Sequence, residues 1–212
     1  MKNKKIYLII LFLLTIFVSS CDYKTLIGED DGVDIVQIET KFTDLVKKVE
    51  PYCIGIKRTN STSEIVGSAV IIKQDEKYTY ALTNSHVVTG GEYKLYVYFG
   101  DNLFIQGEVV HYVEESVYSK NSTKDLAIVK FSTPTFANIA IAPIATSIVN
   151  RGQNILAVGC PLSLDLYNTT STGIVSNVYS GLIQHTAAIN PGNSGGGLFD
   201  LSGRLIGINS SR

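Results

Sequence analysis

The chain has 212 residues, of which 45% are hydrophobic and 17% are charged, and its formal net charge is −1. This length fits one domain of ordinary size and is too short for two large domains. The apolar content allows a buried core and argues against general disorder, and the lack of clustered charge argues against nucleic acid as a partner.

The N-terminal residues predict an export signal. Three lysines within the first five residues precede an apolar run at residues 6–18, which is shorter than the roughly 20 residues of a membrane-spanning helix. The run ends in Val-Ser-Ser-Cys, which resembles a bacterial lipoprotein processing site with Cys21 as the lipidated residue. We therefore expect residues 1–20 to be a lipoprotein signal peptide, and lipid on Cys21 to hold the protein at the extracytoplasmic face of the bacterial cell membrane. An ordinary signal peptide followed by an incidental cysteine is the alternative.

Residues 21–38 are predicted to be a flexible spacer, because residues 22–34 are acidic and contain glycine. The folded domain is expected at residues 39–212 and should begin with a short helix. Apolar residues recur there at helical spacing until Pro51 stops the pattern: Phe42, Leu45, Val46 and Val49. We expect this amphipathic helix to cover the edge of a barrel; contact with a membrane surface is the alternative.

From Cys53 onward, short runs of β-branched and aromatic residues alternate with Gly, Asn, Asp and Ser turns. The predicted strands of the first half are 53–57, 68–73, 78–83, 95–99, 107–112 and 126–131. Those of the second half are 155–159, 170–179, 182–184, 197–199 and 205–209. Strands at this spacing are typical of barrels or sandwiches. Two halves divided near residues 133–150 predict an all-β fold, a double β-barrel with a short N-terminal helix and an active site in the cleft between the barrels.

Two cysteines and two histidines need a separate interpretation. Cys53 and Cys160 lie in apolar, strand-like segments, which favours buried apolar packing, although export also permits a Cys53–Cys160 disulfide. His111 and His185 have no metal-ligand spacing with another His or Cys, so both are predicted to be structural. We expect neither a metal nor another cofactor.

Three residues combine into a pattern typical of acyl-transfer chemistry. His86 follows an apolar strand at a short polar turn, Asp125 opens an apolar run, and Ser194 sits in a Gly-rich turn. Each alone has an ordinary structural interpretation as a turn residue, a loop acid or a turn hydroxyl. Together, in the order His, Asp, Ser and each at a strand edge, they match one of the known orders of the Ser-His-Asp triad.

At this point the chain resembles a trypsin-like serine protease of the bacterial HtrA/Deg type. The matching segments are GSAVII at 67–72, LTNSHVV at 82–88, DLAIVK at 125–130, AVGCP at 157–161, TGIVS at 172–176 and QHTAAINPGNSGG at 184–196. The resemblance implies that His86 is the general base, Asp125 orients it and Ser194 is the nucleophile. It further implies that the N–H groups of Gly192 and Ser194 form the oxyanion hole.

The resemblance also carries expectations about substrates. Ala188 and Ile189 match the base and wall of the primary substrate pocket, and without a carboxylate there the pocket should prefer small or medium aliphatic side chains. Family domains continue past residues 205–209 into another strand and a helix, so the second barrel is expected to be incomplete.

Two functions remain after this reading. The first is a serine endopeptidase acting on polypeptide substrates outside the cytoplasm, by family analogy on damaged or unfolded proteins. The second is a non-catalytic remnant or binding module on an incomplete protease fold. Homo-oligomers, trimers among them, occur in the family, but no residue in this sequence specifies one.

Overall fold

The computed structural model describes residues 35–113 and 125–210, with side chains from Glu39 onward. The predicted signal peptide, Cys21 and most of the predicted spacer lie outside the described residues. The chain divides into Met1–Phe42 and a compact unit, Thr43–Arg212, which contains every strand of the two sheets.

Helix α3 spans Ile35–Val49 and is followed by a short 3-10 helix, η1, at Glu50–Tyr52. The helix therefore begins inside the segment predicted as spacer. Leu45 and Val49 are buried, and the Lys48 amino group donates a hydrogen bond of 2.8 Å to the Ser202 carbonyl in the turn after β10. The last turns of the helix thus cover one edge of the second sheet, as its apolar spacing predicts. Within the described ranges, no helix is both long and apolar enough to cross a membrane.

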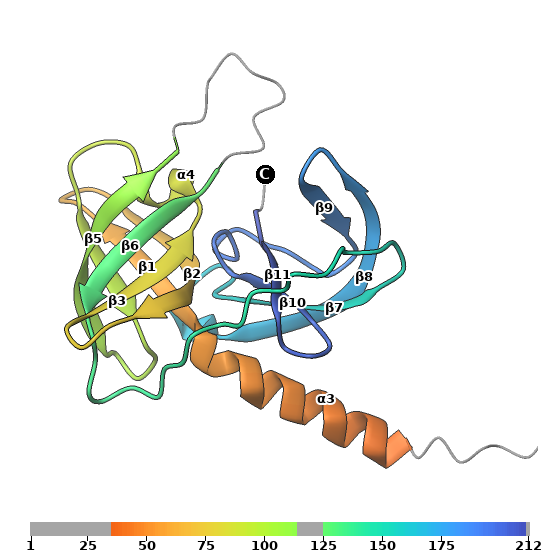
Figure 1. Ribbon diagram of the computed structural model, residues 1–212. Coiled ribbons are helices and arrows are strands. Elements are labelled where there is room, and N and C mark those ends of the chain that lie inside the picture. The colour runs from red at the N-terminus through yellow and green to blue at the C-terminus, as the bar shows by residue number, and fades with distance from the viewer. Residues whose placement is uncertain (1–34, 114–124, 211–212) are drawn as a thin grey trace, which may run out of the picture. The chain divides into compact units, whose positions relative to one another are not determined.

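The first half of the compact unit is a closed antiparallel barrel (Figure 1). Its strands are β1 Cys53–Thr59, β2 Glu64–Gln74, β3 Tyr78–Thr83, β4 Lys94–Tyr98, β5 Phe104–Tyr112 and β6 Ala127–Ser132. They are hydrogen-bonded in the order β1-β2-β3-β6-β5-β4, and β4 closes the ring by pairing with β1. Along β3 and β6, buried residues alternate with more accessible ones, so every second side chain points inward, as expected for barrel strands.

The second half is an open five-stranded antiparallel sheet with the order β11-β10-β7-β8-β9. Its strands are β7 Asn154–Gly159, β8 Thr169–Tyr179, β9 Leu182–His185, β10 Gly197–Asp200 and β11 Leu205–Ile208. A 3-10 helix, η2, spans Leu164–Leu166 between β7 and β8. The predicted fold class is confirmed: a barrel and a half-barrel of β-strands follow a short helix.

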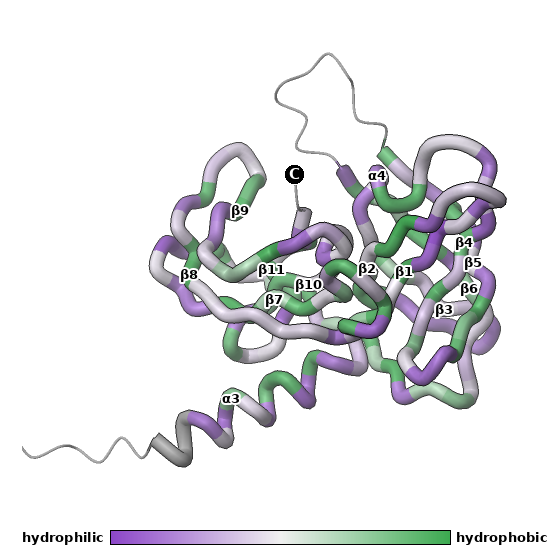
Figure 2. Tube along the Cα trace, turned by 180° about the vertical axis from the view of Figure 1, so that it is seen from behind, coloured by the Kyte–Doolittle hydropathy of each residue, from purple (hydrophilic) through white to green (hydrophobic). Residues whose placement is uncertain are grey.

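Each half has its own apolar core. The barrel core gathers the buried side chains of β1, β2, β3, β4 and β6, with Ile56, Ile71 and Val129 fully enclosed. The core of the second sheet is smaller and centres on Ile155, Ala157, Val175, Ala187 and Leu198. Figure 2 shows the corresponding apolar stretches along β7, β10 and β11, with mostly polar residues in the turns. Two separate cores leave a seam where residues of both halves meet.

The connection between the halves runs through the predicted boundary region. Its main chain binds the barrel at Ala142, whose N–H donates to the Ile71 carbonyl at 2.9 Å. It then binds the second sheet at Ala145, whose N–H donates to the Leu205 carbonyl at 2.9 Å. The connecting segment therefore holds the two halves in contact.

The two cysteines lie at the seam and are not joined. Cys53 begins β1 and Cys160 follows β7, and both thiols are free and buried. Burial raises the pKa of Cys160 to about 11 and raises that of Cys53 further above its usual range. The favoured interpretation, buried apolar packing, is the one that the structure shows.

Candidate active site

His86 lies on α4, a single helical turn at Ser85–Val88 that follows the end of β3. The turn is held against the barrel from both sides of the histidine. The Ser85 hydroxyl donates to the Leu126 carbonyl at 2.7 Å, and Val87 and Val88 are buried in the barrel core. The Asn84 side chain donates to the Asp125 carbonyl at 2.8 Å. These contacts fix the backbone on which the imidazole stands.

The Asp125 carboxylate binds both the imidazole ring and the main chain of His86. Its Oδ2 lies 2.7 Å from His86 Nδ1, and its Oδ1 accepts a hydrogen bond of 3.1 Å from the His86 main-chain N–H. The Asp125 side chain is 12% exposed and that of His86 is 36% exposed. A shielded carboxylate bound at Nδ1 fixes the ring orientation and leaves Nε2 for a second partner.

The segment from Asn190 to Ser194 is a turn in which every main-chain carbonyl is held. The carbonyls of Asn190 and Asn193 accept from the N–H groups of Asn193 and Gly196. The Pro191 carbonyl accepts from the Leu162 N–H at 2.6 Å, and the remaining two bind Ser68. Five consecutive fixed carbonyls make this turn rigid in the main chain.

Two glycines allow the turn to take this shape. Gly192 has φ +96° and Gly195 has φ +87°, values that side chains rarely adopt. A Cβ on Gly192 would also run into the Cys160 carbonyl, and one on Gly195 would run into the Ser68 carbonyl. The glycines around Ser194 are therefore required by both backbone angle and space.

The held carbonyls set the direction of two N–H groups. In a trans peptide the C=O and the following N–H point to opposite sides, and the described peptides include no cis bond. The bond between the Pro191 carbonyl and Leu162 therefore turns the Gly192 N–H away from the Leu162 main chain. In the same way, the hydrogen bond between the Asn193 carbonyl and the Gly196 N–H turns the Ser194 N–H away from Gly196.

Ser68 on β2 joins this turn to the first barrel. Its hydroxyl donates to the Gly192 carbonyl at 2.8 Å and accepts from the Cys160 N–H at 2.9 Å. Its main-chain N–H donates to the Ser194 carbonyl at 2.8 Å, and its own carbonyl accepts from the Thr83 hydroxyl at 2.6 Å. Ser68 is 1% exposed, so these bonds are shielded from water. One barrel residue thus binds both ends of the segment from Gly192 to Ser194.

The same contacts bring the Ser194 turn next to the His86 turn. A Cβ on Gly67 would lie 2.5 Å from a methyl of Val87, the residue after His86, and 3.4 Å from the Ser194 carbonyl. On the other side of the turn, Gly195 packs against the hydroxyl of Thr83 at the end of β3. The structure therefore brings the Ser194 turn of the second half against the β3–α4 corner that carries His86.

The two residues predicted for the primary substrate pocket precede this turn. Ala188 is exposed, and its carbonyl accepts a hydrogen bond of 2.8 Å from the Ser171 hydroxyl on β8. Ile189 is half-buried and packs against the apolar core of the second sheet. Ala188 is thus the more accessible of the two, and Ile189 rests on the sheet behind it.

The structural interpretation of the other two histidines stays a prediction. His111 is exposed on β5, and His185 ends β9, where burial lowers the pKa of its imidazole. Among the described residues, no three His, Cys, Asp or Glu side chains are placed to hold a metal ion. Cys21 lies outside the described residues.

The sequence reasoning missed the residues that position the candidate site. Ser68, Thr83 and Asn84 are buried polar residues, and each binds main-chain groups of a distant segment. Their only signal in the sequence is polarity within or directly after apolar strands. Because buried polar groups need hydrogen-bond partners, that pattern indicates a tertiary hydrogen bond. It does not show which distant residue is the partner.

The fold, a closed β-barrel followed by a half-barrel, leads to a class of protein. A family model described as a trypsin-like peptidase domain matches residues 67–208. Since this range is more than half of the chain, the chain belongs to the trypsin-like peptidase family.

Individual relatives are bacterial proteases. The chain is similar to the serine protease Do-like HtrA of Bacillus subtilis (strain 168), with 30% identity over 204 residues, covering 82% of this chain and 43% of the relative. It is 33% identical over 156 residues to the serine protease Do-like HtrA of Lactobacillus helveticus, covering 69% and 35%. The crystal structure of the serine endoprotease from Yersinia pestis matches with a TM-score of 0.64 and 27% identity, over 80% of this chain and 57% of that one. The chain spans less than half the length of these two curated relatives.

Proposed function

We propose that this protein is a lipid-anchored, extracytoplasmic serine endopeptidase that hydrolyses polypeptides through His86, Asp125 and Ser194. The observation that carries the proposal is the pair of hydrogen bonds that Asp125 accepts from His86, on a corner that packs against the Ser194 turn. Membership of the trypsin-like peptidase family supports the same reaction class.

In this reaction, Ser194 Oγ attacks the scissile carbonyl carbon while His86 Nε2 takes its proton. The carbonyl oxygen becomes an oxyanion, which the N–H groups of Gly192 and Ser194 stabilise. Asp125 holds the imidazole orientation and stabilises the imidazolium. His86 then gives the proton to the leaving amine, the C–N bond breaks, and an acyl-enzyme remains. Water, deprotonated by His86, releases the acyl group and regenerates the Ser194 hydroxyl.

The rigidity of the turn favours this use of the site. An oxyanion hole stabilises the transition state only when its donors are already aimed before the reaction. The hydrogen bonds on the carbonyls of Pro191 and Asn193 aim the two donors in the free protein. The Ser68 bridge adds support from the first barrel.

Labelling with a fluorophosphonate probe and casein hydrolysis together test the proposal. Wild-type protein should be labelled and active, Ser194→Ala should show neither property while keeping its circular dichroism spectrum, and Ser132→Ala should behave like wild type. Ser132 is a matched control because it is an exposed serine at the end of β6. Equal turnover by wild type and Ser194→Ala would remove Ser194 from the mechanism. A folded wild type with neither labelling nor hydrolysis would favour the binding-module alternative.

The anchoring part of the proposal rests on the sequence around Cys21. Two-phase detergent partition of the protein expressed in bacteria should place the wild type in the detergent phase. Cys21→Ser should shift it to the aqueous phase or leave the precursor unprocessed. Incorporation of a labelled fatty acid into wild type and not into Cys21→Ser is the direct readout. Equal incorporation in both proteins would rule out lipid on Cys21.

A further inference from the structure

The helical turn that carries His86, α4, is held differently at its two ends. Its N-terminal side is hydrogen-bonded to the segment around Asp125. On its C-terminal side the chain runs into Gly90 and Gly91, whose φ values of +95° and +79° lie in the left-handed region that favours glycine. Both glycines are exposed, and a Cβ on Gly91 would touch nothing within 4 Å. The loop directly after α4 therefore gives the turn little packing support.

Tyr93, at the far end of this loop, supports the turn instead. Its hydroxyl donates a hydrogen bond to the carbonyl of Val88, the last residue of α4, and its half-buried ring packs against the barrel core. The last carbonyls of a helical turn have no partner within the turn, so a side chain from outside can fix them. Burial raises the pKa of Tyr93, so the hydroxyl keeps the proton that it donates.

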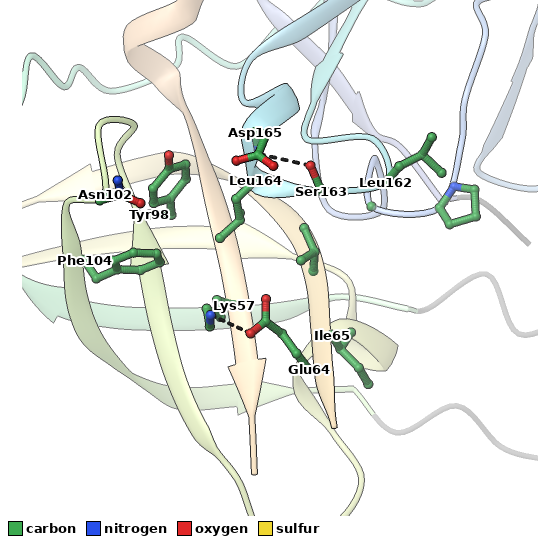
Figure 3. A pocket seen from close by; sticks show the side chains of 13 residues that line it. Lys57, Glu64, Ile65, Tyr98, Asn102, Phe104, Leu162, Ser163, Leu164 and Asp165 are labelled. Atoms are coloured by element: carbon green, nitrogen blue, oxygen red, sulfur yellow. Dashed lines mark hydrogen bonds and ion pairs between the residues drawn. The ribbon is translucent and has the colours of Figure 1, made fainter. Parts of the chain in front are cut away.

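Arg58 lies against the face of the Tyr93 ring, with the guanidinium carbon 4.9 Å from the ring centroid. Successive side chains of a strand point to opposite faces. Along β1, Ile56 lies in the barrel core, whereas Lys57 forms an ion pair with the exposed Glu64 (Figure 3). Arg58 therefore shares the inner face with Ile56, and its guanidinium lies at the end of the barrel that α4 covers.

The choice of arginine at this position is not explained by packing. Its Nη1 is enclosed without a hydrogen bond among the described residues, and a Cβ on Gly90 would lie 3.9 Å from it. An apolar side chain would fill the same place without leaving a donor unpaired. What arginine adds is the attraction between its cation and the face of the Tyr93 ring, which is stronger where water is excluded. The contact therefore restrains the ring whose hydroxyl binds α4.

We propose that Tyr93 is a positioning residue for the general base His86, and that Arg58 acts with it by holding the Tyr93 ring in place. Asp125 fixes the imidazole at Nδ1 and the start of the turn at the His86 N–H. Tyr93 fixes the end of the same turn, so Nε2 keeps one direction. The inference rests on the proposed endopeptidase function, in which that direction decides whether His86 can take the proton of Ser194.

Tyr93→Phe tests the hydroxyl, because it removes one oxygen atom and keeps the ring over Arg58. In the full chain in detergent it should lower kcat by about tenfold with little change in KM, since a small misplacement of a general base slows the chemical step more than it weakens substrate binding. Tyr96→Phe is the matched control, because Tyr96 is another half-buried tyrosine, on β4, with its ring edge-on to Phe104. It should keep the wild-type kcat.

Proton NMR of the free protein provides a readout that needs no catalysis. The proton between His86 Nδ1 and Asp125 Oδ2, which lie 2.7 Å apart, is identified as the low-field signal that is absent from His86→Gln. Tyr93→Phe should broaden this signal or raise its exchange with water severalfold, because the end of the turn is no longer fixed. Tyr96→Phe should leave the signal unchanged.

A double variant tests the part assigned to Arg58. Arg58→Met keeps most of the side-chain volume, removes the charge, and should lower kcat severalfold. If Arg58 acts through Tyr93, the double variant Arg58→Met/Tyr93→Phe should lose no more kcat than Tyr93→Phe alone, because both changes affect one route to His86. Additive losses in the double variant would overturn the role of Arg58.

The two readouts separate the possible failures. An unchanged His86 signal in Tyr93→Phe, or a loss of kcat in Tyr96→Phe as large as that in Tyr93→Phe, would overturn the positioning role. A changed His86 signal in a protein that neither cleaves casein nor reacts with a fluorophosphonate would keep the link between Tyr93 and His86 and overturn the endopeptidase proposal.

Discussion

The hydroxyl of Ser68 donates a hydrogen bond of 2.8 Å to the carbonyl of Gly192, across 124 positions of sequence. Ser68 belongs to the first barrel and Gly192 to the turn of the second half that carries Ser194. The main-chain N–H of Ser68 also holds the Ser194 carbonyl at 2.8 Å. The geometry of the proposed oxyanion hole is therefore set by a residue of the opposite barrel.

The first prediction is that Ser68→Ala lowers kcat by roughly ten- to a hundred-fold with a smaller change in KM. Loss of the hydroxyl frees the Gly192 carbonyl, so the donors aimed at the oxyanion are less fixed, and small misplacements in a catalytic site have effects of this size. Steady-state kinetics on a peptide substrate measure kcat and KM separately. Removing a buried hydroxyl also leaves the Cys160 N–H unpaired, at a cost of about 1–3 kcal/mol in stability, so the assay is run well below the melting temperature.

A matched variant separates positioning from stability. Thr79→Val also removes a buried hydroxyl from the barrel, but this hydroxyl lies 3.0 Å from the Thr133 hydroxyl, in the segment after β6. It should lose stability without the loss in kcat. Parallel losses of kcat in both variants would mean that Ser68 acts only through the fold.

The second prediction is that Asp125→Asn lowers kcat by about 10⁴-fold while the protein stays folded. The aspartate accepts from both the ring and the main chain of His86, at 2.7 Å and 3.1 Å. Asparagine has one acceptor oxygen and one donor group, so it either loses a bond or favours the wrong imidazole tautomer. Burst kinetics with an activated ester, alongside thermal melting, measure both properties. Retention of more than a tenth of wild-type kcat would show that Asp125 does not orient the base.

The strands were predictable because their residues carry a local pattern. β3 occurs at Tyr78–Thr83 as expected, since its buried and half-buried residues alternate along the whole strand. β2 begins at Glu64, four residues earlier than expected, because its exposed start pairs with the end of β1, Thr59 opposite Glu64. Main-chain pairing thus extends the hairpin beyond the buried residues, to Glu64 and Ile65, whose side chains are exposed.

The sequence named candidate residues for the site, but it did not indicate the residues that support them. The order of His86, Asp125 and Ser194 indicated the reaction class, and the structure joins the first two directly. The roles of Ser68 and Leu162 could not be inferred, because each depends on which distant segment lies opposite. The sequence does not show that Ser68, a serine within an apolar strand, binds a carbonyl 124 positions away. It also gives no local sign that Leu162 has a positive φ.

The third prediction concerns the acyl side of the substrate. Ala188→Asp should raise kcat/KM for substrates with Lys or Arg before the scissile bond by about tenfold relative to those with Val or Leu, because the new carboxylate pairs with the cation. The exposed Ala188 side chain leaves room for it, and the bond from Ser171 uses the main-chain carbonyl, which the substitution keeps. Ala188→Asn is the uncharged control. An unchanged profile in Ala188→Asp would place the primary pocket elsewhere.

The fourth prediction is that Cys53 and Cys160 do not react with a thiol reagent in the folded protein. Burial raises the pKa of Cys160 to about 11, so only about one thiol in a thousand is ionised at pH 8, and that of Cys53 is raised further. In a Cys21→Ser background, an Ellman-type assay should find no fast-reacting thiol in native buffer and both thiols in concentrated guanidinium chloride. Rapid native labelling, or missing thiols after unfolding without reductant, would contradict the buried free state.

The last prediction is that acid destabilises the fold in part through His185. Burial lowers the pKa of this imidazole below its usual value of 6.5, and it outweighs a hydrogen bond with the Ala187 main chain that acts in the opposite direction. Below about pH 6.5, His185 is protonated in the unfolded chain but stays neutral in the folded protein. The free energy of unfolding therefore falls as the pH drops from about 6.5 through the pKa of the folded state. His185→Gln should remove part of this fall, and His111→Gln, at an exposed position on β5, should not. Denaturant unfolding of the three proteins at several values between pH 7 and pH 5 measures the slopes. A slope in His185→Gln equal to that of wild type would show that other groups carry the whole acid response.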